Sequence, residues 1–244
     1  TKKETPIYNF TANDGVKHTV WKFIDVSLIE KAFEKIPFLY VADGHHRSAS
    51  AAKVGAKRRE SNHNHTGNEP YNYFLSVLFP ASELKILAYN RVILSLPNTV
   101  DDFRSNLSKT FSIEANGKAH PEEPGEICMY LEGIWNTLKL RNKIHGDNPV
   151  SNLDVSILQN FILEPILKIN DPRENNNIDF IGGIKGTVEL EKWVDDGRAA
   201  VAFSMYPTSM EELFSVADKG MLMPPKSTWF EPKLRSGLLV NTFD

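Results

Sequence analysis

The sequence predicts an α+β fold built around a mixed β-sheet. Short apolar runs rich in β-branched and aromatic residues recur along the chain, which is typical of strands. Segments with apolar residues at helical spacing lie between them. Two pairs of strand-like runs flank tight-turn residues, which predicts hairpins, and another run leads through a glycine into a helix-forming segment. With 41% hydrophobic residues, the 244-residue chain can bury the core of one large or two small domains.

Composition excludes several classes of protein. The net charge of −3, with both signs interspersed, argues against a general nucleic-acid binder. The single cysteine, Cys128, excludes an internal disulfide framework, and its strand-like neighbours predict a buried thiol in a cytoplasmic protein. No run approaches the ~20 apolar residues of a membrane span, and no signal peptide is visible, so we expect no membrane partner.

The first predicted elements are a hairpin, a helix and a buried strand. Residues 7–25 alternate around Asn13-Asp14-Gly15, and Asp-Gly between alternating runs indicates a hairpin. Asp25 or Ser27 then caps a helix over residues 28–35, which Pro37 ends. The apolar run Phe38–Ala42 predicts the central strand of the sheet, which leads into a helix from about Arg47 to Glu60.

The turn between that strand and that helix is the first candidate functional site. It consists of Asp43, Gly44, His45, His46, Arg47 and Ser48. Glycine lets the backbone turn, and the first amides of the helix lack internal partners and carry partial positive charge. The guanidinium of Arg47 and the two imidazoles complete a cradle suited to phosphate. Strand–turn–helix units are common, and an arginine after a glycine is often only a helix-start charge, but consecutive polar residues in so short a connection favour a functional site.

The polar stretch 57–70 predicts a helix end that runs into a loop. His63 and His65, taken with His45 and His46, fit no familiar zinc-ligand spacing, so we expect no protein metal site here and a loop that folds over a bound nucleotide. Tyr73–Phe79 and Leu84–Leu94 predict two further strands. The second strand carries Arg91, which is either an exposed charge or a ligand of phosphate or carboxylate.

The second half of the chain predicts alternating helices and strands. The predicted helices cover residues 100–108, 188–193 and 209–217, with another that starts at Asn152 or Asp154, and the predicted strands cover residues 111–114, 126–131, 135–140, 178–181 and 199–206. Residues 224–237 form a polar, proline-fixed tail that includes Lys226. The tail is either a loop held against a site or a strap whose Trp229 and Phe230 fill the core. We expect a nucleotide-binding portion over residues 1–110 and a C-terminal α/β portion over residues 111–244.

A family resemblance follows from these motifs. The run Tyr40-Val41-Ala42-Asp43-Gly44-His45-His46-Arg47 resembles the hallmark of a widespread uncharacterised prokaryotic family related to the free serine kinases, within the ParB/sulfiredoxin-like superfamily. Residues 14–18, 72–75, 89–92 and 223–230 also resemble family signatures, so the resemblance covers nearly the whole chain. It implies a ParB/sulfiredoxin-like core in which Gly44, His45, His46, Arg47 and Ser48 bind nucleotide phosphates. It also raises Arg91 and Lys226 to candidate phosphate ligands.

The function predicted from these features is nucleotide-dependent phosphate transfer to a small hydroxylated metabolite, with free serine as one acceptor to test. The resemblance implies ATP or ADP, and phosphoryl transfer usually requires Mg²⁺. Asp43 and His46 are the predicted catalytic residues, with Glu30 or Glu34 as other carboxylates. The alternative is a non-catalytic nucleotide-binding regulatory module of the ParB-like type. The acidic balance and the lack of a helix-turn-helix with a basic face argue against DNA contact. Sulfiredoxin-like activity is rejected, because His45 stands where a cysteine would be needed.

Overall fold

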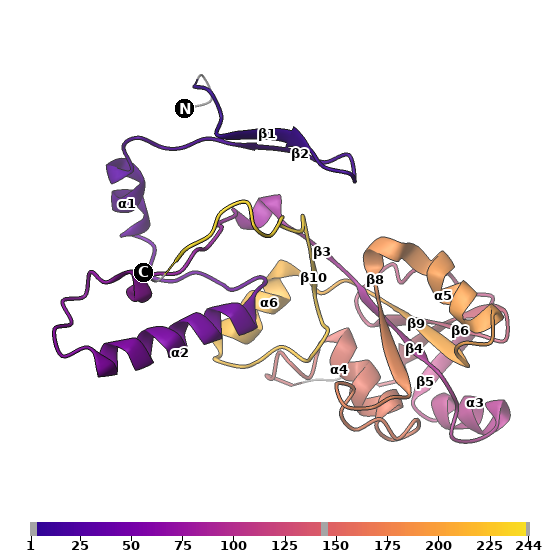
Figure 1. Cartoon of the computed structure of the whole chain (residues 1–244). Coiled ribbons are helices and arrows are strands. Elements are labelled where there is room, and N and C mark those ends of the chain that lie inside the picture. The colour runs from indigo at the N-terminus through magenta and orange to yellow at the C-terminus, as the bar shows by residue number, and fades with distance from the viewer. Residues whose placement is uncertain (1–3, 143–145, 243–244) are drawn as a thin grey trace. The chain divides into compact units, whose positions relative to one another are not determined.

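The computed structural model describes residues 4–142 and 146–242, which form two compact units, Thr1–Val41 and Ala42–Asp244. Figure 1 shows the elements of each unit. The helices within these ranges do not include one long and apolar enough to cross a membrane. The predicted boundary at residue 110 stays a prediction. Strand β4 (Tyr89–Ile93), which precedes this boundary, lies in the same sheet as strands that follow it.

The first unit holds the predicted hairpin and helix. Strands β1 (Tyr8–Thr11) and β2 (Lys17–Val20) pair antiparallel, and the backbone amide of Val16 donates to Asp14 Oδ1 at 3.1 Å in the turn between them. Helix α1 covers Ser27–Phe33, and the backbone amide of Ser27 donates to the carboxylate of Asp25 at 2.9 Å. The hairpin and the helix are therefore confirmed, and Asp25 stabilises the start of the helix.

The predicted central strand at residues 38–42 is wrong. These residues form no strand, and the side chains of Phe38 and Leu39 are 64% and 57% exposed. A run of β-forming residues becomes a strand only when a partner strand accepts its backbone hydrogen bonds and a packed layer buries its side chains. Within the described ranges, this run has no partner strand, and only Ala42 at its end packs against a buried cluster.

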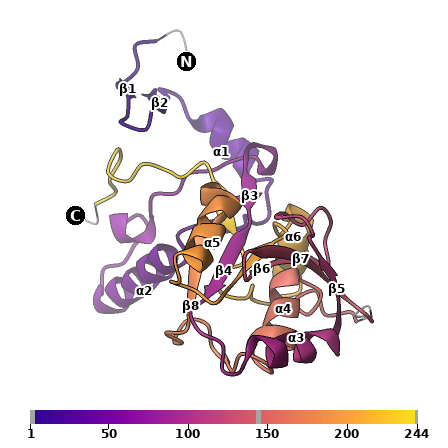
Figure 2. The ribbon, with the colours of Figure 1, turned by 90° about the vertical axis from the view of Figure 1, so that its right-hand side faces the viewer.

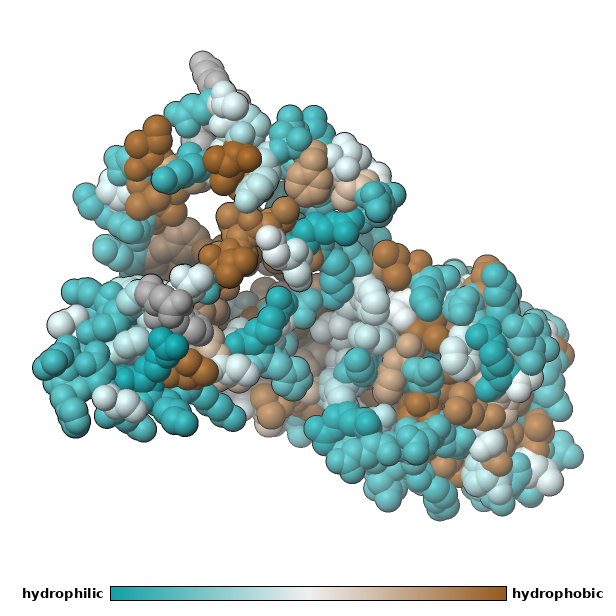
Figure 3. Space-filling view, viewed as in Figure 1, coloured by the Kyte–Doolittle hydropathy of each residue, from teal (hydrophilic) through white to brown (hydrophobic). Residues whose placement is uncertain are grey.

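The predicted strand at Tyr73–Phe79 is wrong for the same reason. The run is irregular, and Tyr73 and Val77 are 59% and 53% exposed. The space-filling view of Figure 3 shows apolar side chains on the surface that faces the viewer. The hydrophobicity of such a run therefore does not decide whether it is buried.

The second unit is organised by a six-stranded sheet with the strand order β5-β7-β6-β9-β4-β8. Its strands are β4 (Tyr89–Ile93), β5 (Phe111–Ala115), β6 (Glu126–Leu131), β7 (Ile134–Leu140), β8 (Ile178–Gly182) and β9 (Val201–Met205). The prediction of an α+β fold is confirmed, and so is the β6–β7 hairpin, which turns at Glu132-Gly133. The prediction of a mixed sheet is wrong, because every pair of strands in the described residues is antiparallel.

Helices cover both faces of this sheet (Figure 1; Figure 2). The helices of the second unit are α2 (His45–Ser61), α3 (Val100–Ser108), α4 (Asp154–Leu158), α5 (Gly186–Asp195) and α6 (Met210–Asp218), and a π-helical turn over Gln159–Leu163 continues α4. Successive strand residues point to opposite faces. Ile93 and Phe203 accordingly pack in the cluster that holds α3 and α4, whereas Val92 and Ala202 pack in the cluster that holds α5.

A smaller sheet joins the tail to the middle of the chain. Strand β10 (Trp229–Glu231) pairs antiparallel with β3 (Lys85–Leu87), and Phe230 is buried in a cluster with Ile86 and Leu213 of helix α6. The predicted strand at Leu84–Leu94 is therefore two strands, β3 and β4. The tail does fill part of the core, as one of its two interpretations required.

Helix α6 begins with a capping box. The hydroxyl of Ser209 accepts a hydrogen bond from the backbone amide of Glu212 at 3.1 Å. In return, the carboxylate of Glu212 accepts a hydrogen bond from the backbone amide of Ser209 at 2.8 Å. These two bonds satisfy amides that a helix leaves without internal partners.

Replacement of Ser209 by alanine is expected to lower the free energy of unfolding by about 1 kcal/mol, because one of the two capping bonds is lost. Urea denaturation of both proteins measures the difference. The matched control is Ser105→Ala in helix α3, where an exposed interior position should tolerate alanine or gain slightly. Equal transition midpoints for Ser209→Ala and the parent would contradict the capping role.

Two buried groups have shifted pKa values. Cys128 is buried, which confirms the prediction of a buried thiol, and its burial raises the pKa of the thiol to about 11. Burial also raises the pKa of Asp154 to about 7, and the negative charges of Glu212 and Glu126 add to this effect against the hydrogen bond that Gly125 donates at 2.8 Å. Between pH 3.8 and about pH 7, the carboxyl group of Asp154 is therefore mainly protonated in the folded state. In the unfolded chain, where its pKa has the ordinary value of 3.8, it is mainly ionised.

Asp154 is expected to make the protein less stable as the pH rises from 3.8 to about 7. In that range the unfolded state binds fewer protons than the folded state, so the free energy of unfolding falls with pH and then levels off. Asp154→Asn keeps the acceptor for Gly125 and removes the titration. Its stability relative to the parent should therefore increase between about pH 5 and about pH 8 in urea denaturation. The exposed Asp196→Asn is the control, and a pH-independent difference for Asp154→Asn would contradict the assignment.

Candidate functional site

The turn that begins helix α2 is built around Gly44. Gly44 has a left-handed φ of 86°, and its carbonyl accepts the backbone amide of Ser48 at 2.9 Å and the hydroxyl of Ser48 at 3.1 Å. No side chain caps the helix, so the amides of the first turn remain available to an anion. The predicted helix from about Arg47 to Glu60 is confirmed as α2, which is one turn longer than the prediction.

Two contacts hold this turn against the rest of the second unit. Ala42 packs against the buried cluster of Ile86, Leu213 and Phe230. The next residue, Asp43, accepts a hydrogen bond from the ammonium group of Lys233 at 3.1 Å, although the two residues are 190 positions apart in the sequence. The tail therefore lies against the turn, as the other interpretation of the tail required.

Asp43 is an ionised carboxylate at neutral pH. Burial raises its pKa, but hydrogen bonds from Lys233 and Gly44 and the charges of Lys233 and Arg47 outweigh that effect, and the pKa lies below its ordinary value. The amide of Gly44 donates to Asp43 Oδ1 at 2.7 Å, which orients the carboxylate at the mouth of the turn. With 60% of its side chain exposed, Asp43 can reach a ligand or a metal ion.

Arg47 contributes an available cation at the same place. A Cβ atom at Gly44 would lie 3.4 Å from Arg47 Nη2, so the guanidinium group lies over the turn. Within the described chain, the guanidinium makes neither a hydrogen bond nor an ion pair, and His45 and His46 are exposed next to it. The side chains of His45, His46 and Arg47 therefore all belong to the first turn of helix α2.

A row of cations and aromatic rings continues from Asp43 through the second unit. The ammonium group of Lys233 lies 5.1 Å from the ring centroid of Trp229, and that ring lies 5.3 Å from the ring of Tyr89. On the other side of the row, the ammonium group of Lys226 lies 5.4 Å from the ring centroid of Tyr89. Cations at such distances are attracted to aromatic faces, so each lysine is held against a ring, and Lys233 is held beside the turn as well.

Arg91 ends this row in the interior. Only 3% of the residue is exposed, and its guanidinium donates to the carbonyls of Tyr89 and Lys226, the latter at 3.0 Å. Burial lowers its pKa to about 10, so the group stays protonated at neutral pH. No carboxylate pairs with it in the part of the chain that the structure describes. The interpretation as an exposed charge is therefore wrong, and a buried cation without an acidic partner is a candidate anion ligand.

The structure brings some predicted site residues together and separates others. Asp43 and Arg47 share the turn, and the tail connects them to Arg91 and Lys226. The other predicted carboxylates, Glu30 in α1 and Glu34 directly after it, belong to the first unit. Sequence reasoning assigned no role in the site to Lys233, Trp229 or Tyr89. The signals for them were the cations and aromatic residues of the tail and, for Tyr89 and Trp229, the family signatures at residues 89–92 and 223–230.

Several hydrogen bonds lie within the loop that follows α2. The carboxylate of Glu69 accepts the amide of Thr66 at 2.6 Å and the amide of Gly67 at 3.0 Å, and it lies 2.9 Å from the ring of His65. His65 is also 3.0 Å from the hydroxyl of Tyr71. Among the described residues, His, Cys, Asp and Glu form no group of three or more suited to a metal ion.

Comparisons with known proteins identify a family. The model of the family described as "Protein of unknown function (DUF1015)" matches residues 1–156, which is more than half of the chain. Among proteins of curated function, none matches this sequence.

Solved structures show weaker similarity. A mutant free serine kinase in complex with AMP is 14% identical, with a TM-score of 0.39 over 78% of this chain and 66% of that chain. A mutant free serine kinase in complex with ADP is 16% identical, with a TM-score of 0.42 over 80% and 70%. A conserved hypothetical protein from Pyrococcus furiosus is 15% identical, with a TM-score of 0.41 over 80% and 72%. This chain thus spans about two thirds of the length of the first of these proteins.

Proposed function

We propose that this chain, which belongs to the DUF1015 family of proteins of unknown function, is a nucleotide-dependent phosphotransferase that acts on a small hydroxylated metabolite. The observation that carries the proposal is the turn Asp43–Arg47, where an ionised carboxylate and an available guanidinium lie beside the uncapped first turn of a helix. Phosphoryl transfer needs this combination, because the protein must hold phosphates and orient an acceptor hydroxyl.

Each residue of the turn has a proposed part in that reaction. The first amides of α2, with Gly44, His45, Ser48 and Arg47, bind the phosphates of ATP or ADP. Lys226 and Arg91 supply further positive charge for phosphate. The resemblance of the turn to the Gly-X-X-Arg motif of the ParB/sulfiredoxin-like proteins supports this assignment, and with it a nucleotide-binding core within residues 1–110.

The acceptor chemistry is assigned to Asp43 and His46. The acceptor oxygen forms a bond to the terminal phosphorus of the nucleotide, the bond from that phosphorus to the leaving nucleotide breaks, and the hydroxyl proton passes to the carboxylate of Asp43. His46, exposed one turn from Asp43, donates to the transferred phosphoryl group. The exposed carboxylate also fits Mg²⁺, which prefers one or two carboxylates together with phosphate oxygens and would neutralise their charge.

A nucleotide panel tests the proposal. Thermal shift is measured with ATP, ADP and AMP, each with and without Mg²⁺, and nucleotide turnover is then followed with free serine and with a pool of hydroxylated metabolites. Stabilisation by a nucleotide and transfer to an acceptor would support the proposal. No stabilisation by any nucleotide would contradict it, since a ligand that binds only the folded state must raise the melting temperature.

A second candidate function is a nucleotide-binding regulatory module without turnover. The contact between Asp43 and Lys233 favours it, because a carboxylate that already accepts an ammonium group is less available to a hydroxyl or a metal ion. Nucleotide binding without phosphate transfer to any acceptor would decide for this module. For either function we propose a cytoplasmic protein whose partner is a nucleotide and not a nucleic acid.

A further inference from the structure

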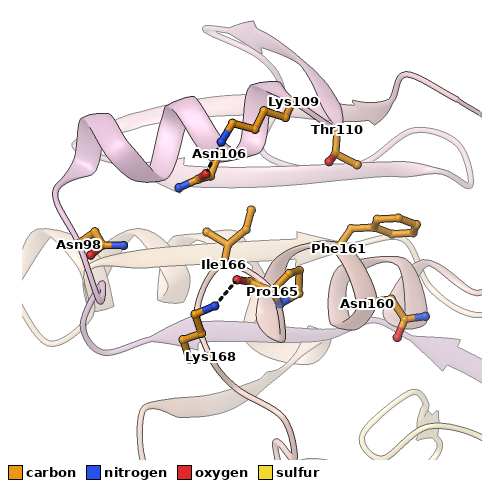
Figure 4. A pocket seen from close by; sticks show the side chains of 9 residues that line it. All are labelled: Asn98, Asn106, Lys109, Thr110, Asn160, Phe161, Pro165, Ile166 and Lys168. Carbon is orange, nitrogen blue, oxygen red and sulfur yellow. Dashed lines mark hydrogen bonds between the residues drawn. The ribbon is translucent and has the colours of Figure 1, made fainter.

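A cavity of about 460 Å³ lies in the second unit, between the end of helix α3 and the π-helical turn that follows α4. Figure 4 shows its lining side chains. They are Asn98, Asn106, Lys109, Thr110, Asn160, Phe161, Pro165, Ile166 and Lys168. None of them belongs to the candidate site of the turn Asp43–Arg47, and the volume falls in the range of small-molecule sites.

The charges of this cavity are of one sign. It is lined by two lysines and by no aspartate or glutamate. The ammonium group of Lys109 donates to the side-chain oxygen of Asn106 at 2.8 Å, and that of Lys168 donates to the carbonyl of Pro165 at 2.9 Å. Both partners are neutral, so neither positive charge is compensated within the lining. An ammonium group has three N–H donors, and each lysine therefore retains donors for an anion.

The floor of the cavity is apolar and packed. Phe161 and Ile166 are half-buried against the main hydrophobic cluster, and the ring of Phe161 meets the ring of Phe111 edge to face at 6.5 Å. In Figure 4 they face the side of the cavity that carries Asn106, Lys109 and Thr110. Lys109 and Asn106 thus lie opposite Phe161 and Ile166, whereas Lys168 lies next to Pro165 on the same side as Ile166.

The backbone around the cavity departs from regular structure. The amide of Glu164 donates to the carbonyl of Gln159 at 3.0 Å, five residues back, and Lys168 has a left-handed φ of 60°. A non-glycine residue rarely adopts that conformation, and π-helical turns are frequent at functional sites. The side-chain amide of Gln159 donates to the carbonyl of Ile169 at 2.8 Å and holds the distorted segment in place. This distortion places Lys168 at the edge of the cavity.

We propose that this cavity binds a small organic anion with an apolar or aromatic body. The anionic group pairs with Lys109 and Lys168, the asparagine amides donate to its remaining oxygens, and the body packs on Phe161 and Ile166. This site is separate from the proposed nucleotide site and does not depend on it.

The probe for the test is 4-phenylbutyrate, added without nucleotide to the full chain. Binding is followed by the NMR signal of the Ile166 methyl groups and by calorimetry. We expect a saturable shift of the Ile166 signal and no saturable shift near Arg47. The neutral amide of the same acid should bind about tenfold more weakly, because it forms no charge-assisted bond.

Variants locate the binding. Lys109→Gln and Lys168→Asn should each weaken binding by about tenfold. Asparagine tolerates the left-handed conformation at position 168, so the backbone should be retained. Lys185→Gln, an exposed lysine outside the cavity, is the control and should leave the affinity unchanged. No saturable shift at Ile166 up to about 10 mM, or equal affinities for all three variants, would overturn the proposal.

Discussion

Asp43→Asn is expected to lose about 100-fold or more in the rate of phosphate transfer while it binds nucleotide at least as tightly as the parent. The amide cannot accept the proton of the acceptor hydroxyl and binds Mg²⁺ more weakly than a carboxylate. At the same time, the substitution removes a negative charge that repels phosphate at short range.

The fold should survive this substitution. The carbonyl oxygen of asparagine can still accept the amide of Gly44, and the lost ion pair with Lys233 is exposed and contributes little to stability. Single-turnover rates with the nucleotide and acceptor found in the panel, together with calorimetric affinities, separate the two effects.

Asp196→Asn, which changes an exposed carboxylate on another part of the second unit, is the control and should transfer phosphate like the parent. Full turnover by Asp43→Asn would remove Asp43 from the catalytic role. Loss of nucleotide binding, in contrast, would assign Asp43 to the positioning of the turn.

Arg47→Lys is expected to weaken nucleotide binding by about 1.5–3 kcal/mol with the fold intact. The planar guanidinium binds two phosphate oxygens at once, whereas the ammonium group of lysine offers a single charge. The guanidinium makes no ion pair or hydrogen bond in the described residues, and lysine keeps the positive charge that acts on Asp43.

Calorimetry of both proteins with the same nucleotide measures this effect. Arg104→Lys in helix α3, which only changes an exposed contact with Glu132, is the matched control and should bind within about 0.5 kcal/mol of the parent. An affinity of Arg47→Lys equal to that of the control would place the phosphates elsewhere.

Local signals in the sequence were sufficient for the elements whose causes are local. Thr99 accepts the amide of Asp102 at 3.1 Å and begins α3 where the sequence predicted. The turn Glu132-Gly133 joins β6 and β7 because both residues adopt positive φ in a short connection. Such features depend on contacts between residues a few positions apart, which a single sequence displays.

Burial of the apolar runs could not be predicted in the same way. Phe38–Ala42 and Ile127–Leu131 have similar apolar composition, yet the first is exposed and irregular and the second is a buried strand. The difference is that β6 has β7 and β9 as neighbours, and the first run has no paired strand in the described residues. Strand formation depends on the partner as much as on the segment.

The same distinction between local features and distant contacts applies to the candidate site. The residues Asp43–Arg47 were identified from the sequence alone, because a glycine turn, a helix start and clustered polar side chains are local features. The tertiary structure alone decided that Lys233 reaches Asp43 and that Arg91 is buried beside the tail. Those contacts join residues more than a hundred positions apart, and they arise only because β10 pairs with β3 and β4 lies between β8 and β9.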